Sequence, residues 1–246
     1  MTVPGRPEAL RLLLSLDPPP WHLRHSRGVA ETAGWLAARI ATRGIPVDRP
    51  LVESAALLHD IDKLLPATDP ARALPHGDGA AAWLTRRGYP ELSRAVANHP
   101  VTRLADEARY SRWSAFATRE ERIVAYADKR FGQRLEPMAA RFAEWERRHP
   151  PAGTAPDTRG DELVDARGVE MAEPGEPPAE PPREARRDPS NAPWTRATLA
   201  RVWARAVRLE TDVCRAAGVE PPDVRRLRWT DTLLRRANLI DDQAAG

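Results

Sequence analysis

The sequence predicts an all-α fold, a helical bundle, and three observations lead to this fold class. Apolar residues recur at helical spacing along most of the 246 residues. The strict alternation of apolar and polar residues that marks a half-buried strand is absent. Prolines, glycines and capping residues stand where they start or stop helices. A hydrophobic content of 41% is enough for the core of one sizeable domain.

Three helices are predicted in the first quarter of the chain. They cover about residues 7–16, 22–43 and 48–63. A run of three prolines stops the first, because proline cannot continue a helix, and Gly44 stops the second. Asp48 is a good N-cap for the third. His25 lies on the apolar stripe of the second helix and His59 on that of the third, so both are expected to point towards the core.

The middle of the chain is predicted to continue the bundle. A fourth helix begins at His76, where small residues follow that let a backbone or ligand approach closely. A short helix covers about residues 90–99, and the segment 101–117 is expected to be irregular. Thr118 opens the next helix with a capping-box pattern. Another helix covers about 137–149.

A change in composition predicts three regions. Residues 1–150 form the main helical domain, and residues 151–193 hold nine prolines and almost no large apolar side chains, which is typical of a disordered linker or insertion. Residues 194–246 are expected to form trailing helices that pack on the first domain or on another subunit. The first of them covers 195–217, with Gly218 as its stop, and an arginine-rich helix ends near Asn238.

Composition also excludes several classes of function. No apolar run approaches the roughly 18 to 20 residues of a membrane span, and the start lacks the layout of a signal peptide. The single cysteine, Cys214, cannot form an internal disulfide and fits a buried helical position. We therefore expect a cytoplasmic protein that does not bind membranes. The net charge of +3 is unevenly distributed, because residues 1–150 and 194–246 are basic and residues 151–193 are acidic. Basic faces on the folded parts favour anionic ligands such as nucleotides, without selecting nucleic acid over small phosphates.

The residues that carry chemistry centre on the segment from His59 to Lys63. Histidine nitrogens together with carboxylate oxygens are the ligands that borderline or hard divalent metals prefer. The candidate metal ligands are His25, His59, Asp60, His76, His99 and Asp128. Asp60 is also a candidate catalytic residue. A second is Lys63, three residues further on, which could hold a phosphate oxygen. Asp62 is a candidate to orient a ligand or water, with a surface carboxylate as the alternative interpretation.

Each of these residues has a plain structural alternative. His22 and His149 are interpreted as structural, although His22 is close enough to His25 to replace it as a ligand. Lysine occurs only twice, at Lys63 and at Lys129 beside Asp128, so Lys129 is a second functional candidate, with an ordinary surface lysine as its alternative. Three arginines are candidates for binding the distal phosphates of a substrate, namely Arg27, Arg130 and Arg134.

The order of these residues resembles the HD phosphohydrolase superfamily, whose helical domain binds divalent metal through the pattern H…HD…D. Residues 24–30, 57–63 and 123–129 resemble its motifs, and the resemblance covers about residues 6–149. The additional histidines His76 and His99 resemble the subset with a two-metal centre. The resemblance implies an all-helical, HD-type metal-dependent phosphohydrolase in which the helices after residue 195 complete the bundle.

The resemblance also implies how the ligands are shared. One metal would be held by His25, His59, Asp60 and Asp128, and the second by Asp60, His76 and His99, with Asp60 bridging the two. Iron or manganese is favoured, and magnesium, cobalt, nickel and zinc are the alternatives. Two such cations would activate a hydroxide and clamp the phosphoryl oxygens.

The substrate stays open at this point. The spacing is most similar to the bacterial symmetrical diadenosine tetraphosphate hydrolases, but His99 is followed by Pro100, Val101 and Thr102 where that family carries Thr-Thr-Gly. We expect hydrolysis of a phosphoester or phosphoanhydride bond in a nucleotide-like substrate. The alternatives are a cyclic or 2′,3′-phosphodiesterase on the same centre, and a nucleic-acid-associated or regulatory module with a structural metal. The arginines of the last helix motivate that last alternative, with a solvated helix face as the plainer interpretation.

Overall fold

A computed structural model describes residues 3–148, 151 and 194–226 of the chain. The described residues form helices and contain no strand, so the predicted all-α fold class is confirmed. The predicted linker 151–193 lies outside the described residues except for Pro151. The arginine-rich last helix also lies outside them, apart from the backbone of its first turns up to Arg226. None of the described helices is long and apolar enough to cross a membrane.

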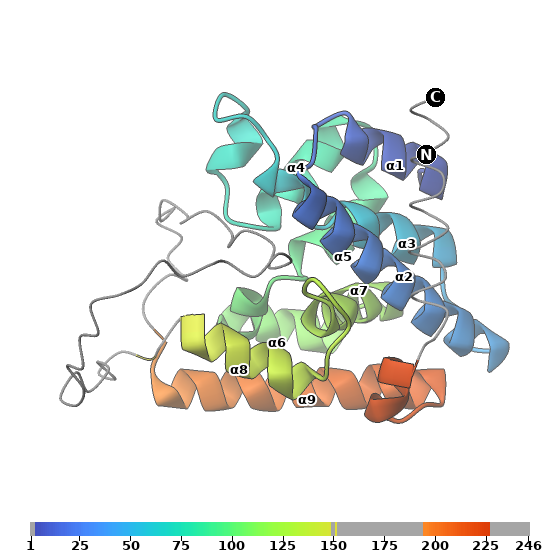
Figure 1. The fold of residues 1–246 in the computed structure, drawn as a ribbon, viewed down its shortest axis with the longest axis vertical. Coiled ribbons are helices and arrows are strands. Elements are labelled where there is room, and N and C mark those ends of the chain that lie inside the picture. The colour runs from blue at the N-terminus through green and yellow to red at the C-terminus, as the bar shows by residue number, and fades with distance from the viewer. Residues whose placement is uncertain (1–2, 149–150, 152–193, 227–246) are drawn as a thin grey trace, which may run out of the picture.

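The first three helices are α1 (Arg6–Leu14), α2 (Pro20–Thr42) and α3 (Arg49–Leu58) (Figure 1). Each has proline in its first turn, where the missing amide hydrogen is not needed. The Asp48 side chain accepts a hydrogen bond from the backbone of Leu51, as expected for the N-cap of α3. Helix α2 is the most deeply buried element of this group, with thirteen buried residues.

The predicted continuation of the third helix to Lys63 is wrong. Helix α3 ends at Leu58, and Asp60 has φ −100° and ψ 11°, outside the α-helical region. A 3₁₀ turn, η1 (Ile61–Lys63), follows. Neighbouring residues on an α-helix diverge by about 100°, so the change of backbone at Asp60 is what allows His59 and Asp60 to face the same centre. Nothing in the local sequence signals this break before Pro66.

The next helices are short and separated by turns. They are η2 (Pro70–Ala73), α4 (Asp78–Arg86), η3 (Pro90–Leu92) and α5 (Ser93–Ala97). The predicted start of the fourth helix at His76 is two residues early, because Gly77 has a φ of +86° that interrupts the helical backbone. The predicted helix 90–99 is divided into η3 and α5, and His99 lies just beyond its end.

The expectation of an irregular segment at 101–117 is wrong. It contains the 3₁₀ helix η4 (Val101–Leu104) and the α-helix α6 (Glu107–Phe116). The Asp106 side chain caps α6 by accepting from Arg109 N. No residue of α6 is buried. A helix without a buried face leaves no apolar stripe in the sequence, which is why the pattern did not reveal it.

The remaining described helices are α7 (Arg119–Arg130), α8 (Met138–Arg148), α9 (Arg196–Ala217) and the 3₁₀ helix η6 (Pro221–Arg226). The capping box of α7 is formed by Thr118 and Glu121, as predicted. Gly218 ends α9 with a φ of +66°, which confirms the predicted stop. An isolated bridge between Phe131 and Leu135 closes the loop after α7.

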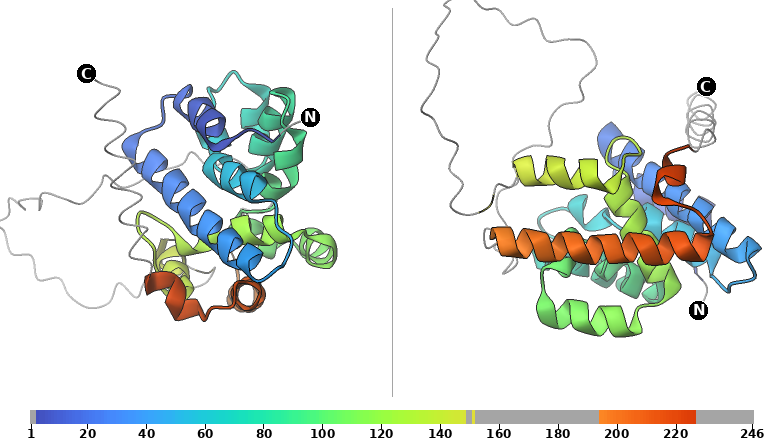
Figure 2. Two further views of the ribbon diagram at one scale, coloured as in Figure 1. Left: turned by 90° about the vertical axis from the view of Figure 1, so that its right-hand side faces the viewer. Right: turned by 90° about the horizontal axis from the view of Figure 1, so that it is seen from below.

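The core lies between α2, α3 and α7, which pack against one another. Helix α1 packs on α3, and α4 packs on α5 (Figure 1). Helix α9 packs on α2 and α7 and lies along one side of the bundle (Figure 2). Tyr126 of α7 donates a hydrogen bond to Glu210 of α9 at 2.9 Å, and Cys214 is buried next to it. The helix after the linker thus contacts the main core, while the division of the chain into domains stays a prediction.

Candidate metal centre

Four histidine rings converge from four different segments of the bundle. His25 comes from the middle of α2, His59 from the end of α3, His76 from the turn before α4, and His99 from the turn after α5. The Phe131 ring packs directly against Gly28, where a Cβ atom would not fit. This close packing brings the loop after α7 to His25. Helix packing therefore brings four segments that are well separated in the sequence together around one point.

In each ring the Nδ1 atom faces an oxygen. His25 Nδ1 lies 3.0 Å from Gly132 O, His59 Nδ1 lies 2.6 Å from Ala56 O, and His99 Nδ1 lies 2.6 Å from Val96 O. His76 Nδ1 lies 3.0 Å from an Asp62 carboxylate oxygen. These oxygens accept hydrogen bonds, so each Nδ1 carries the hydrogen. The neutral rings consequently present the lone pair of Nε2 to the centre.

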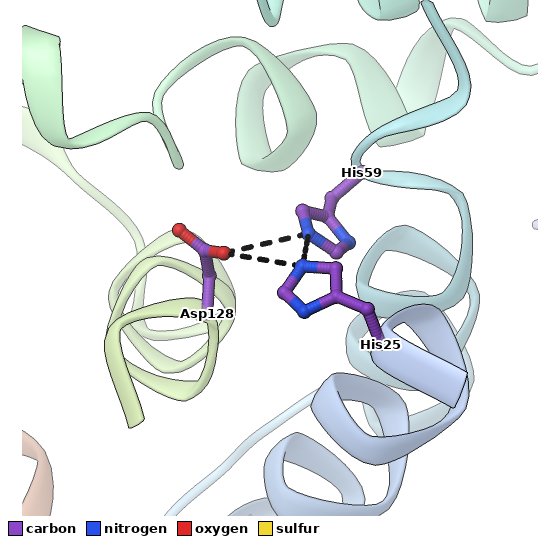
Figure 3. A group of neighbouring side chains, drawn as sticks. All are labelled: His25, His59 and Asp128. Atoms are coloured by element: carbon purple, nitrogen blue, oxygen red, sulfur yellow. Dashed lines mark hydrogen bonds and ion pairs between the residues drawn. The ribbon is translucent and has the colours of Figure 1, made fainter. Parts of the chain in front are cut away.

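The first ligand group contains His25, His59 and Asp128 (Figure 3). The two Nε2 atoms lie 3.1 Å apart, and each lies 3.5 Å from Asp128 Oδ1. Asp60 Oδ2 completes the group at 3.4 Å from His25 Nε2 and 3.6 Å from His59 Nε2. Two atoms bound to one ion at about 2.1 Å lie roughly 3.0–3.4 Å apart. The observed separations are close to this range.

The second group contains Asp60, His76 and His99. The Nε2 atoms of the two histidines lie 3.2 Å apart. Asp60 Oδ1 lies 3.2 Å from His76 Nε2 and 3.3 Å from His99 Nε2. Asp60 Oδ1 is buried and has no hydrogen-bond partner among the described residues. An orphaned buried carboxylate oxygen between two imidazole nitrogens fits a cation position.

Asp60 therefore faces both groups, one with each oxygen. Oδ2 points to His25 and His59, whereas Oδ1 points to His76 and His99. Two other sets of side chains also lie close enough together to hold an ion: His59 with Asp60 and His99, and Asp60 with Asp62 and His76. In the latter set Asp62 faces Nδ1 of His76, on the far side of the ring. The chemistry of the donors thus fits divalent metal, and several overlapping sets of these side chains could hold an ion.

Burial and charge act against each other in this centre. Burial disfavours protonation of His25, but Asp128 and Asp60 outweigh it and raise its pKa to about 9. Burial alone would raise the pKa of Asp60, but Lys63 and His59 hold it well below its usual range. Burial lowers the pKa of His99 to about 4. Asp60 is therefore an anion, and His25 carries a proton when no other cation is bound.

The three candidate catalytic residues lie in different positions relative to the ligand groups. Lys63 Nζ lies 2.5 Å from Asp60 Oδ2, and its side chain is 23% exposed. Asp62 is buried and lies behind His76, where it also accepts a hydrogen bond from Gly77 N at 2.9 Å. Asp62 is thus a buried partner of His76, which makes the alternative of a surface carboxylate wrong, while its role in orienting a ligand stays a prediction. Asp60 is common to both groups.

Two arginines that sequence reasoning missed support this arrangement. Arg72 donates to the backbone oxygens of Asp62 and Lys63 at 3.0 and 2.6 Å. Arg103 donates to His76 O at 2.7 Å and pairs with Asp78 at 2.9 Å. An arginine that holds a backbone carbonyl leaves no signal in a sequence, because any residue supplies the carbonyl.

The small residues after His76 were expected to allow close approach, and Gly79 shows this. A Cβ atom there would lie 2.5 Å from Ala71 O and 3.1 Å from Asp62 Cβ. Gly77, which has a positive φ, donates a hydrogen bond from its backbone N–H to the Asp62 carboxylate. These two glycines let α4 start directly behind Asp62.

Other candidates lie away from the ligand groups. His22 is buried and has no hydrogen-bond partner among the described residues, and His25 rather than His22 belongs to a group of side chains that could hold an ion. Lys129 is buried, which excludes the ordinary surface lysine. Arg130 is buried and pairs with Glu210 at 3.3 Å. Arg134 is exposed and pairs with Glu136 at 2.8 Å.

Of the remaining candidates, Arg27 is partly buried on α2, two residues after His25, and its role in phosphate binding stays a prediction. His149 lies outside the described residues. The pairing of Arg130 with Glu210 is a structural link between α7 and α9, so the interpretation of Arg130 as a phosphate ligand is not supported.

Comparison with known proteins gives one match. Residues 23–131 match the family model described as HD domain, and all six candidate ligands lie within this range. The match supports the HD-domain superfamily for this part of the chain, and HD domains are in general metal-dependent phosphohydrolases. No curated protein and no solved structure matches the chain. The likeness to diadenosine tetraphosphate hydrolases is not confirmed and stays a prediction.

Proposed function

We propose that this chain, which carries an HD domain over residues 23–131, hydrolyses a phosphoester or phosphoanhydride bond in a nucleotide-like substrate. The observation that carries the proposal is the position of Asp60. Its two oxygens face two different pairs of imidazole nitrogens at 3.2–3.6 Å. One carboxylate shared between two nitrogen-rich groups is the arrangement that a pair of divalent cations needs.

In this proposal the first cation is held by His25, His59, Asp60 and Asp128, and the second by Asp60, His76 and His99. When bound, such cations lower the pKa of a coordinated water and neutralise charge on the phosphoryl oxygens. Histidine nitrogen with carboxylate oxygen suits borderline and hard metals. We favour iron or manganese, with magnesium, cobalt, nickel and zinc as alternatives.

The residues of the chain have distinct roles in this proposal. The four Nδ1–H groups are each held by an oxygen, so the rings are fixed in the tautomer that offers Nε2 to a cation. The low pKa values of Asp60 and Asp128 keep both carboxylates charged. Asp62 orients His76 and does not contact the substrate.

The substrate reaches the centre from the side of Lys63, His76 and Asp128. Their side chains are 23%, 26% and 19% exposed, while those of His59, Asp60 and His99 are buried. The ammonium of Lys63 is at this opening, where it can hold a phosphate oxygen and stabilise negative charge in the transition state. A small phosphate compound can reach the centre through this opening, which supports a nucleotide as substrate. We place the protein in the cytoplasm, in keeping with its single, buried cysteine.

The proposal is tested by hydrolysis of a panel of nucleotides. The panel holds mononucleotides, dinucleoside polyphosphates and cyclic or 2′,3′-phosphodiesters, each with Mn²⁺ or Fe²⁺ added. We expect turnover with the wild type and a loss of at least about 100-fold with Asp60→Asn, because the bridging charge is removed. Asp212→Asn is the matched control, because this exposed carboxylate on α9 pairs with Arg122, away from the ligand groups. Absence of turnover on every phosphate compound would contradict the proposal.

A further inference from the structure

Lys129 follows Asp128 on α7, and its side chain is directed to a different neighbour. Its Nζ atom donates to His99 O at 2.7 Å and to Ala125 O at 3.1 Å. The residue is only 5% exposed. Adjacent residues on a helix diverge by about 100°. Helix α7 thus supplies Asp128 to the first ligand group and, through Lys129, contacts the backbone of the second.

The ammonium of Lys129 is buried and forms no salt bridge within the described part of the chain, although the charge of the neighbouring Asp128 favours its protonated form. Burying a charge in this way disfavours folding, and an apolar side chain of similar length would fill the same space without that penalty. What the ammonium adds over such a side chain is its hydrogen bonds to His99 O and Ala125 O and its interaction with the charge of Asp128, and the bond to His99 O is the one that reaches another segment. An ordinary packing residue would not need a charge here.

His99 needs such support because it stands beyond the end of α5, in a turn before Pro100. Its ring is fixed at Nδ1 by Val96 O, but the ring position also depends on the backbone from which it extends. His76, its partner in the second group, has the same kind of support, since Arg103 donates to His76 O at 2.7 Å. Arg103 forms an ion pair with Asp78 at 2.9 Å, whereas Lys129 interacts with the charge of its neighbour Asp128 without a salt bridge in the described part of the chain.

We propose that Lys129 is a positioning residue that fixes His99, and through it the second cation site, at a set distance from Asp128. This inference rests on the proposed function, because it concerns the second of the two proposed sites. It assigns Lys129 no contact with the substrate. Residues that orient metal ligands from behind typically change metal affinity by about 10- to 100-fold when replaced.

The test is a titration of metal-free protein with Mn²⁺, comparing the wild type with Lys129→Met. We expect the second equivalent to bind about 10- to 100-fold more weakly in the variant, with the first equivalent unchanged. The thermal stability of the metal-free variant is expected to be equal or higher, because a buried charge is removed. Arg119→Met is the matched control, since it removes the same charge from the first turn of α7. An unchanged second equivalent would overturn the inference.

A metal-free measurement separates this inference from the proposed function. If the wild type binds fewer than two ions or hydrolyses no phosphate compound, the proposed function fails. The side-chain resonances of His99 in metal-free protein still report on Lys129, and we expect them to shift in Lys129→Met. Unchanged resonances would overturn the positioning role. If the methionine variant does not fold, Lys129→Gln is measured instead, because glutamine is shorter but still carries a hydrogen-bond donor. We then expect a smaller loss of affinity for the second Mn²⁺ ion and a smaller shift of the His99 resonances.

Discussion

The Nε2 atoms of His25 and His59 lie 3.1 Å apart, although the Nδ1 atom of each ring already donates to a backbone carbonyl. Two neutral rings in this tautomer would place two lone pairs against each other. A cation between them removes the conflict, and the nearby carboxylates of Asp60 and Asp128 supply the opposite charge. In the metal-free protein this cation is a proton on His25, and a divalent metal would replace it.

Metal binding is therefore expected to release a proton. The pKa of His25 is raised to about 9 in the metal-free protein, chiefly because the two carboxylates outweigh burial, and a ligand must be neutral. At about pH 7.5 we expect roughly one proton from His25 for each chain loaded, and none above about pH 10. Calorimetric titration with Mn²⁺ in buffers of different ionisation enthalpy measures this number. Equal proton release at both pH values would contradict the assignment.

Asp62→Asn is expected to weaken metal binding without unfolding the protein. Asp62 accepts from His76 Nδ1 and Gly77 N, and an amide in its place offers one acceptor oxygen where the carboxylate has two. We expect the affinity for the second metal to fall by about 10- to 100-fold, with little change in the first. Asp69→Asn, a carboxylate paired with Arg86 outside the ligand groups, is the control. Equal behaviour of the two variants in a metal titration would show that Asp62 does not orient His76.

Gly79→Ala is expected to destabilise the fold. The added Cβ atom would lie 2.5 Å from Ala71 O, a backbone atom that cannot move away as a side chain could. Overpacking of this kind costs about 1–3 kcal/mol. Gly5→Ala is the control, because the nearest atom to its Cβ would be 3.8 Å away. The stability of both variants is measured by urea unfolding of the metal-free proteins. Equal unfolding midpoints for Gly79→Ala and Gly5→Ala would refute the close approach of α4 to Asp62.

His22 is expected to make the metal-free protein sensitive to acid. Burial lowers its pKa from 6.5 to about 4, so the folded state holds the ring neutral. A lowered histidine pKa gives stability that is fully present above pH 6.5 and is lost as the pH falls towards 4. Replacing the ring by His22→Leu should flatten the stability curve in this interval. Unfolding midpoints measured across it for both proteins test the expectation, which parallel curves would contradict.

The sequence was sufficient to predict which side chains would converge, but not what holds them. The six candidate ligands were visible because histidine next to aspartate on apolar helices is unusual, and the structure brings all six together. The oxygens that fix three of the rings belong to the backbones of Gly132, Ala56 and Val96. A backbone carbonyl has no sequence signature, so these contacts depend on packing alone.

The errors in the predicted elements have physical causes of the same kind. Helix α6 has no buried residue and therefore no apolar stripe to reveal it. The sequence does not predict the turn at Asp60, because no glycine or proline marks it. The side chains of neighbouring residues on an α-helix diverge by about 100°, so His59 and Asp60 can face one centre only if the helix ends between them. The sequence predicts a catalytic role for Asp62 but does not reveal its contact with His76, because the two residues are fourteen positions apart and η2 lies between them.

The most direct test of the central claim is a crystal structure of Mn²⁺-loaded protein with the metal located by anomalous scattering. We predict two ions per chain, one among His25, His59 and Asp128, and one between His76 and His99. Asp60 is expected to contact both, one oxygen to each, as its position in the present structure indicates. A single ion, or ions that leave Asp60 uncoordinated, would contradict the two-metal centre.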